Sequence, residues 1–366
     1  MPKSPLITGQ YINEKRQINV DFLKAFAILY MVLVHVYEEL SIYYDGAAPG
    51  VFGYVVEFLG GPLAAPVFMF SMGLGMIYTK HRSPLELFKR GVFLFVFSYL
   101  FNFLHEGIPC LIVDLVNREF DSMDFLCRVL EVDILQFAGL SFMFTALLKK
   151  LEVPLTGMLV ISLVMQVVGS VVPALETENP FVLYSLGLFV PTGEYSFFPM
   201  FMWFFYPVVG MLIGKNLKQV EDLERLHKLL LLCGVLLGAY TFSLVVNGVN
   251  PVELFTIEDE LFYKQDLIRD LFNLFVIGFV SAVLFFTVGR IKSQKALKLV
   301  MTMSSRLNEI YINQWMLIGF VIIFQDLELI PYFGYGLTAL VALIIVALSV
   351  LLSSTTAKAM DKINFV

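Results

Sequence analysis

Ten apolar segments, each long enough to cross a lipid bilayer, recur along this chain of 366 residues. A spanning helix needs about 20 apolar residues, so such a series predicts an all-α polytopic membrane protein. The composition agrees, because 58% of the residues are hydrophobic and only 15% are charged, whereas soluble domains contain about a quarter charged residues. The predicted spans are 20–44, 52–79, 87–108, 132–148, 153–174, 197–214, 228–247, 270–289, 305–325 and 335–353.

The basic residues divide unequally between the two sets of loops that these spans define. With the N-terminus inside, all but four of the 25 lysines and arginines fall in cytoplasmic loops or at cytoplasmic helix ends. Because basic residues concentrate on the cytoplasmic side of membrane proteins, both termini are predicted to be cytoplasmic. We therefore expect a cytoplasmic segment at 1–19, one transmembrane domain at 20–353 and a cytoplasmic tail at 354–366. The four exceptions are Arg118, Arg128, Lys264 and Arg269.

Several common signals do not occur. The N-terminal residues are polar and the first apolar run is too long for a signal peptide, so no cleavable signal is expected. There is no P-loop and no dinucleotide-binding, zinc-protease or serine-hydrolase motif. The three cysteines, Cys110, Cys127 and Cys233, lack metal-ligand spacing, so no metal is expected. A disulfide between Cys110 and Cys127 stays open, because sequence alone gives neither geometry nor redox state.

The segment Val20–Tyr44 carries ionisable residues within an apolar run. Lys24 and His35 lie eleven residues apart, which places both side chains on one face of a helix, about 16 Å apart along its axis. An ionisable side chain inside a membrane helix is costly and indicates function. Glu38 and Glu39 follow one turn after His35, where either could orient the imidazole.

The second span contains signals for a break and for close packing. Gly60, Gly61 and Pro62 should break or kink the helix. Gly73 and Gly75 follow at small-residue spacing, which permits close helix approach. Beyond the third span, an amphipathic pattern between Phe120 and Leu130 predicts a short helix on the outer surface. The remaining outer segments, 176–195 and 247–266, are polar and aromatic.

A cluster of cations surrounds the predicted cytoplasmic end of the first span. Such a rim suits phosphates, and a neutral imidazole is a good general base near neutral pH. Coenzyme A has a phosphorylated nucleotide and a long pantetheine arm, whose length is comparable with the separation of Lys24 and His35. Membrane topology alone would also produce a basic rim. The cations are Lys24, Lys80, Arg82, Lys89 and Arg90.

Several motifs resemble those of known membrane acyltransferases. The spacing of Lys24 and His35 in VDFLKAFAILYMVLVH resembles the first-helix motif of the membrane acyltransferase-3 family. The segment APVFMFSMGLGMIYTKHRSPLELFKRG resembles the second helix and basic loop of that family. The heparan-alpha-glucosaminide N-acetyltransferase branch and its bacterial relatives are closer still, judged by AAPVFMFSMG, VDILQFAGL, FFPMFMWFFYPVVGMLIGK and NEIYINQW.

The resemblance implies a cytoplasmic acetyl-CoA or other acyl-CoA donor, an extracytoplasmic sugar acceptor and a multi-pass location in the bacterial inner membrane. It makes His35 the catalytic base or acyl-handling residue. It also implies that Lys24, Arg82, Arg90 and the second-helix Ser71 bind the donor. The sequence departs from the family pattern in three places. Gln314 stands where relatives often have histidine, Met72 follows Ser71 in place of glycine, and Lys24 replaces a more usual arginine.

Further polar residues are candidates for the acceptor side. His105 and Glu106 form an alternative acid/base pair at the outer end of the third span. Two other histidines, His81 and His227, are expected in solvated inner loops. Trp203 and the following aromatic residues are expected to pack or lie at the interface. The residues that could line an acceptor cavity are Asn102, Asp133, Gln136 and Gln314.

We therefore predict an integral membrane acyltransferase that acylates a hydroxyl or amine of an extracytoplasmic carbohydrate. Direct attack assisted by His35 and a ping-pong route through acyl-histidine both stay open. The alternative function is a proton-coupled transporter or exporter of a glycan or lipid-linked intermediate, with His35, Glu38 and Glu39 as the proton relay. We expect contact with membrane lipid and none with nucleic acid, and a homodimer stays open.

Overall fold

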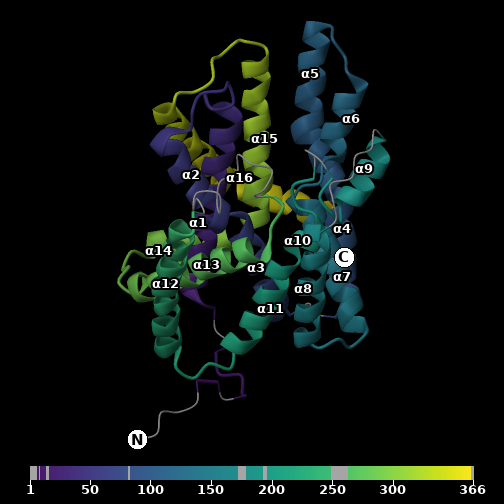
Figure 1. Cartoon of the computed structure of the whole chain (residues 1–366). Helices are drawn as coiled ribbons and strands as arrows, with labels where there is room; N and C mark the ends of the chain where they lie inside the picture. The colour runs from purple at the N-terminus through teal and green to yellow at the C-terminus, as the bar shows by residue number, and fades with distance from the viewer. Residues whose placement is uncertain are drawn as a thin grey trace, which may run out of the picture.

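The structure is a computed structural model of the chain, and it describes residues 6–7, 9–13, 16–80, 83–171, 179–192, 196–248 and 263–363. These residues form helices joined by short connections, with isolated β-bridges but no strand among them. The predicted all-α fold class is confirmed (Figure 1). The helices are α1 (Ile18–Leu40), α2 (Gly50–Leu63), α3 (Ala65–Tyr78), α4 (Pro84–Asn102), the π-helix η1 (Phe103–Gly107), α5 (Ile108–Asn117), α6 (Ser122–Leu130), α7 (Ile134–Lys150), α8 (Leu155–Val171), α9 (Pro180–Gly187), α10 (Met200–Trp203), α11 (Phe205–Leu217), α12 (Leu223–Val246), α13 (Leu267–Val288), α14 (Gln294–Ser305), α15 (Leu307–Asp326) and α16 (Tyr335–Ile363).

Each of the ten predicted spans contains helix, and 8 helical segments within the described residues are long and apolar enough to cross a membrane. The other two predicted spans form α7 and α8, with 17 residues each, which is near the lower limit for a spanning helix. The protein is therefore a multi-pass integral membrane protein. The eight segments are Ile18–Leu40, Gly50–Tyr78, Pro84–Asn117, Met200–Leu217, Leu223–Val246, Leu267–Val288, Leu307–Asp326 and Tyr335–Met360.

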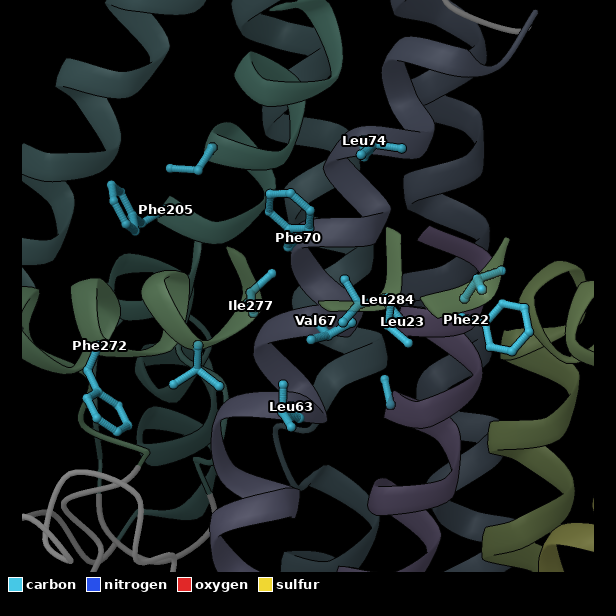
Figure 2. Packing of buried hydrophobic residues seen from close by; sticks show 14 residues of the cluster. Phe22, Leu23, Leu63, Val67, Phe70, Leu74, Phe205, Phe272, Ile277 and Leu284 are labelled. Atoms are coloured by element: carbon cyan, nitrogen blue, oxygen red, sulfur yellow. The ribbon is translucent and has the colours of Figure 1, made fainter. Parts of the chain in front are cut away.

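Helix α1 lies among six other helices and packs against α2, α3, α13, α14, α15 and α16. Phe22 and Leu23 on one side join a cluster with α3, α11 and α13 (Figure 2). Ile28, Val32 and Val36 join a second cluster with α15 and α16. Because apolar packing fixes α1 on two sides, the polar side chains on its remaining face are held in defined positions.

The chain breaks between α2 and α3, as the glycine-proline sequence predicted. Ala64 has φ −104° and ψ −90°, outside the helical region. Pro62 lies in the last turn of α2, and Pro66 lies in the first turn of α3, where its missing N–H removes no helical hydrogen bond. The break places Ala64 and Ala65 at the wall of a small cavity described below.

Helices α3 and α11 pack backbone against backbone. A Cβ atom added to Gly73 would lie 1.9 Å from the carbonyl oxygen of Pro207. One added to Gly210 would lie 2.1 Å from the carbonyl oxygen of Phe70. In contrast, a Cβ atom at Gly75 would meet nothing within 4 Å. The predicted close approach at the second span therefore depends on Gly73.

Helices α4 and α7 form a second close pair, and α5 continues beyond the end of α4 (Figure 1). Cβ atoms added to Gly91 and Gly139 would each lie within 3 Å of the backbone of the facing helix. The predicted amphipathic helix is α6, which Asp121 caps by accepting hydrogen bonds from the backbone of Met123 and Asp124. The third span exceeds its predicted length, because η1 and α5 extend it to Asn117.

Three further sequence predictions concern His227, the C-terminal tail and the cysteines. The expectation of a solvated His227 is wrong, because this side chain is 3% exposed and stacks on Phe285 of α13 at 3.8 Å between ring centroids. Helix α16 runs to Ile363, through much of the predicted tail. Cys110 and Cys127, which were candidates for a disulfide, are both free cysteines.

Candidate active site

A cavity of about 470 Å³ opens between α1, α3, α4, α7, α14 and α15. Three of the predicted donor-binding residues, Lys24, Ser71 and Arg90, line this cavity, although they come from three different helices. The Arg90 guanidinium lies 4.7 Å from the centre of the Phe142 ring, a cation–π contact that positions the charge. Glu309 also lines the wall. We call this space the Lys24 cavity.

The other predicted donor-binding residues do not line the Lys24 cavity. Lys80 and Lys89 are exposed on the protein surface near the ends of α3 and α4. Arg82 and His81 lie outside the described residues. The basic cluster therefore separates into cations inside the cavity and cations on the neighbouring surface.

Asp21, an acidic residue in the first turn of α1, takes part in a network of hydrogen bonds. Its carboxylate accepts hydrogen bonds from Arg16 at 2.6 and 2.9 Å and from the Ser304 hydroxyl at 2.6 Å. Arg16 also donates to the carbonyl oxygen of Met301. These bonds join α1 to α14 next to Lys24, so they hold one wall of the Lys24 cavity.

A smaller cavity of about 40 Å³ lies farther along the same helices. His35 and Glu38 of α1 line it together with Asp133, at the start of α7. Tyr263 and Tyr311 complete its polar wall. We call this space the His35 cavity. Carboxylate, imidazole and phenol groups in one wall can donate and accept hydrogen bonds, as a ligand rich in hydroxyl groups requires.

The imidazole of His35 is held by two residues of α15. Its Nδ1 atom lies 3.0 Å from the Nε2 atom of Gln314, which is fully buried. Its ring lies over the Trp315 indole with 4.3 Å between centroids. The sequence pointed to Glu38 or Glu39 as the orienting group. The structure shows Gln314 in contact with Nδ1, and Glu39 does not line the His35 cavity.

His105 also packs against the Trp315 indole. Its ring centroid is 5.3 Å from that of Trp315, and its Nδ1 atom is 3.2 Å from a Glu106 carboxylate oxygen. Glu106 in turn lies 3.5 Å from Arg128 of α6. Both His105 and Glu106 belong to the π-helical turn η1, and such turns occur frequently at functional sites. Trp315 thus contacts two histidines that are far apart in the sequence.

Three of the predicted acceptor-side residues form hydrogen bonds within the protein. Asp133 accepts a hydrogen bond from the Tyr311 hydroxyl, which links α7 to α15. Gln136 is fully buried and forms the capping box of α7, bonding the backbone of Asp133 and Glu131. Asn102 also donates to the carbonyl oxygen of Glu131. Gln136 and Asn102 therefore support the cavity wall and do not line it.

The two cavities follow one another along four shared helices. On α3 and α7 their lining residues are less than one turn apart, with Phe68 and Leu135 in the wall of the Lys24 cavity. The ring centroids of Phe68 and Tyr311 are 6.2 Å apart across this boundary. The paired lining residues are Lys24 and Met31 on α1, Phe68 and Ala65 on α3, Leu135 and Ile134 on α7, and Leu307 and Tyr311 on α15.

Some residues of this site were missed by sequence reasoning. Tyr311 and Trp315 are four residues apart in NEIYINQW, and this helical spacing could have placed them on one face. Tyr263 and Glu131 gave no sequence signal. Burial raises the pKa of Glu131 well above its usual range, and the carboxylates of Glu106 and Asp133 raise it further.

Comparison with known proteins identifies the family. The sequence model described as heparan-alpha-glucosaminide N-acetyltransferase, catalytic, matches residues 16–238. This range contains Lys24, His35, Ser71 and Arg90, whereas Gln314 lies beyond it. Comparisons with curated proteins and with solved structures found no match. Because the matched range covers more than half of the chain, the protein belongs to the heparan-alpha-glucosaminide N-acetyltransferase catalytic family of membrane acetyltransferases.

Proposed function

We propose that this protein transfers an acetyl or other short acyl group from acyl-CoA, bound from the cytoplasm, to a hydroxyl or amine of a carbohydrate on the opposite side. The observation that carries the proposal is the succession of two cavities along shared helices. One contains the cations Lys24 and Arg90, and the next contains His35. A donor with an anionic head and a long arm fits this arrangement.

The donor fits the Lys24 cavity by charge and by length. Lys24 and Arg90 offer positive charge inside the cavity, and the exposed Lys80 and Lys89 add positive charge on the neighbouring surface. Phosphate groups bind such cations through charge-assisted hydrogen bonds. The axial distance of about 16 Å between Lys24 and His35 is comparable with an extended pantetheine arm. The arm would pass between Phe68 and Leu135 to bring its thioester to His35.

The direction of transfer follows from charge distribution. The Lys24 end of α1 belongs to the side that carries most lysines and arginines, and such sides face the cytoplasm. The His35 end is surrounded by carboxylates, with Glu38 and Asp133 in the cavity wall. Carboxyl and phenol groups suit a carbohydrate, because they can donate and accept hydrogen bonds with its hydroxyl and amino groups.

In the direct reaction, His35 takes the proton from the acceptor hydroxyl or amine as its oxygen or nitrogen attacks the thioester carbonyl carbon. The new carbon–oxygen or carbon–nitrogen bond forms, the carbon–sulfur bond breaks, and the thiolate of coenzyme A takes the proton from His35. Excluding water from the cavity prevents hydrolysis of the thioester. In a ping-pong reaction His35 would instead carry the acyl group between the two substrates.

Donor binding is tested first with the purified wild-type protein, acetyl-CoA and a measurement of thioester consumption. Lys24→Glu is expected to raise the dissociation constant of acetyl-CoA at least about tenfold, or ~1.4 kcal/mol, because it reverses a charge inside the cavity. Lys89→Glu makes the same charge change on the nearby surface and should have a much smaller effect. Absence of donor binding by wild type would exclude the enzyme, and equal effects of both variants would exclude Lys24 as a donor residue.

The contact between Gln314 and His35 makes a second prediction. For His35 to act as a base through Nε2, its Nδ1 must carry the hydrogen and donate it to the Gln314 side-chain oxygen. Turning the Gln314 amide by 180° exchanges its oxygen and nitrogen atoms, which places the oxygen 3.0 Å from Nδ1 of His35.

Gln314→Leu should therefore lower kcat about fivefold to tenfold, the effect of losing a hydrogen bond of about 1 kcal/mol, with unchanged donor affinity. Gln314→Glu keeps an acceptor and should retain more turnover than Gln314→Leu. If Gln314→Leu is as active as wild type, Gln314 does not position the base. Thermal unfolding of both variants serves as the folding control.

A further inference from the structure

A buried polar cluster outside both cavities has no role in the proposed reaction. It consists of Gln166 on α8, Tyr206 on α11, and Gln265, Asp270 and Asn273 at the start of α13. Gln166 is 2% exposed and the other four side chains are fully buried. Buried polar groups are costly to keep in a membrane protein unless all of them are satisfied, so the pairing within this cluster is informative.

The hydrogen bonds of the cluster leave oxygen atoms without donors. Gln166 donates from Nε2 to Asp270. Asn273 donates to the Tyr206 hydroxyl at 2.8 Å and to Gln265 at 3.3 Å, and Tyr206 donates to Gln265 at 3.2 Å. Three buried oxygen atoms then have no hydrogen-bond partner: Oε1 of Gln166, Oδ1 of Asp270 and Oδ1 of Asn273.

The donors of the cluster do not reach these three oxygen atoms. Tyr206 also lies next to the Asp270 carboxylate, but its single hydroxyl hydrogen cannot serve both Asp270 and Gln265. Turning the Gln166 amide would satisfy its oxygen only if Asp270 carried a proton. Three unpartnered oxygen atoms therefore remain on Asp270, on its partner Gln166 and on Asn273 one turn along α13.

The charge of Asp270 is likewise uncompensated. Among the described residues, no lysine, arginine or histidine forms an ion pair with it. The nearest arginine in sequence, Arg269, pairs with Asp266 at 2.7 Å. A buried carboxylate with no positive partner is strongly unfavourable, so it needs either a proton or a bound cation.

We propose that this cluster binds a monovalent alkali-metal cation, such as Na⁺, through Asp270 and the side-chain oxygens of Gln166 and Asn273. Hard cations prefer carboxylate and amide oxygens as ligands, and all three orphaned oxygen atoms are of these kinds. One carboxylate balances one positive charge. The described residues contain no group of three or more histidines, cysteines, aspartates or glutamates placed to hold a metal, which argues for a monovalent ion over a divalent one.

The proposed cation site adjoins the His35 cavity. Trp203, one turn before Tyr206, donates from its indole nitrogen to the carbonyl oxygen of Tyr263 at 3.1 Å. Tyr263 lies two residues before Gln265 and lines the His35 cavity. A cation held by α8 and the start of α13 would therefore fix the chain that supplies Tyr263 to the cavity wall.

The test uses the full-length protein purified in detergent, with its melting temperature measured in choline chloride and in increasing NaCl or KCl at constant ionic strength. We expect a saturable rise of several degrees with at least one of the two metal chlorides, because a ligand of the folded state stabilises it. Radioactive sodium or rubidium should bind at about one ion per chain. Both measurements need only the wild-type protein.

Variants then assign the effect to the cluster. Asp270→Asn should abolish both the salt-specific rise and ion binding, and Gln166→Leu should weaken binding. Asp326→Asn, which removes a carboxylate elsewhere at the end of α15, should respond to the cation as wild type does. Equal melting temperatures of wild type in choline, sodium and potassium salts would overturn the proposal and show that Asp270 is neutralised by a proton. A cation response that survives in Asp270→Asn would also overturn it.

Discussion

His35→Ala is expected to lower the turnover number about 10²- to 10⁴-fold, the usual contribution of a general base, while the affinity for acetyl-CoA changes little. The expected result follows from the separation of His35 from the donor-binding cations. His35 lines the second cavity, about 16 Å from Lys24 along α1, and its ring is held by Gln314 and Trp315. Removing the imidazole leaves the donor-binding cations in place. Turnover is measured by coenzyme A release at saturating acetyl-CoA, and donor affinity by direct binding.

Chemical rescue separates a catalytic role of His35 from a structural one. The deleted side chain leaves space beside Trp315, and added imidazole can enter it and accept the proton. We expect imidazole to restore part of the activity of His35→Ala and to leave wild type unchanged. The melting temperature of the variant serves as the folding control. Unchanged turnover in His35→Ala would remove this residue from the reaction and direct attention to the pair His105 and Glu106, whose histidine contacts the same indole.

Gly73→Ala is expected to destabilise the protein more than any other single methyl addition in α3. The added Cβ would lie 1.9 Å from the carbonyl oxygen of Pro207, a backbone atom that cannot rotate away. Helices α3 and α11 must then separate, which disturbs the shared cluster that contains Phe70 and Phe205 (Figure 2). Overpacking typically costs about 1–3 kcal/mol, and a backbone clash should lie at or above the upper end of this range.

Gly75→Ala provides the matched control. It adds the same methyl group to the same helix, where nothing lies within 4 Å, and alanine favours helix by up to about 1 kcal/mol over glycine. Its melting temperature should equal or exceed that of wild type, whereas Gly73→Ala should melt lower or fail to accumulate in the membrane. Similar melting temperatures for the two variants would contradict the backbone contact between α3 and α11.

Local features of the site were predictable from sequence because they depend on one helix at a time. Lys24 and His35 share a face of α1 through helical periodicity alone. The break near Ala64 follows from glycine and proline chemistry. Lys24, Ser71 and Arg90 were grouped by predicted topology and resemblance, and the structure brings all three to one cavity.

Other features depend on contacts between distant segments. Gln314 contacts His35 across 279 residues, so a search near His35 pointed instead to Glu38 and Glu39. The sequence predicted that Gln136 lines a cavity, but its side chain completes the capping box at the start of α7. His227 looked solvated because it follows a charged loop, yet packing of α12 against α13 buries it. In each case the contacting residue lies on another helix or in a turn, and the sequence pattern does not specify the geometry of that contact.

The sequence by itself determined the membrane class, the positions of the spans and the phase of Lys24 and His35, because hydrophobicity and helical period act locally. The tertiary structure decided which helices surround the two cavities, which side chain holds His35, and that Trp315 contacts both His35 and His105. It also gathered Gln166, Asp270 and Asn273 into one buried cluster. These outcomes depend on how packed helices rotate and approach one another, which spacing along a single chain does not specify.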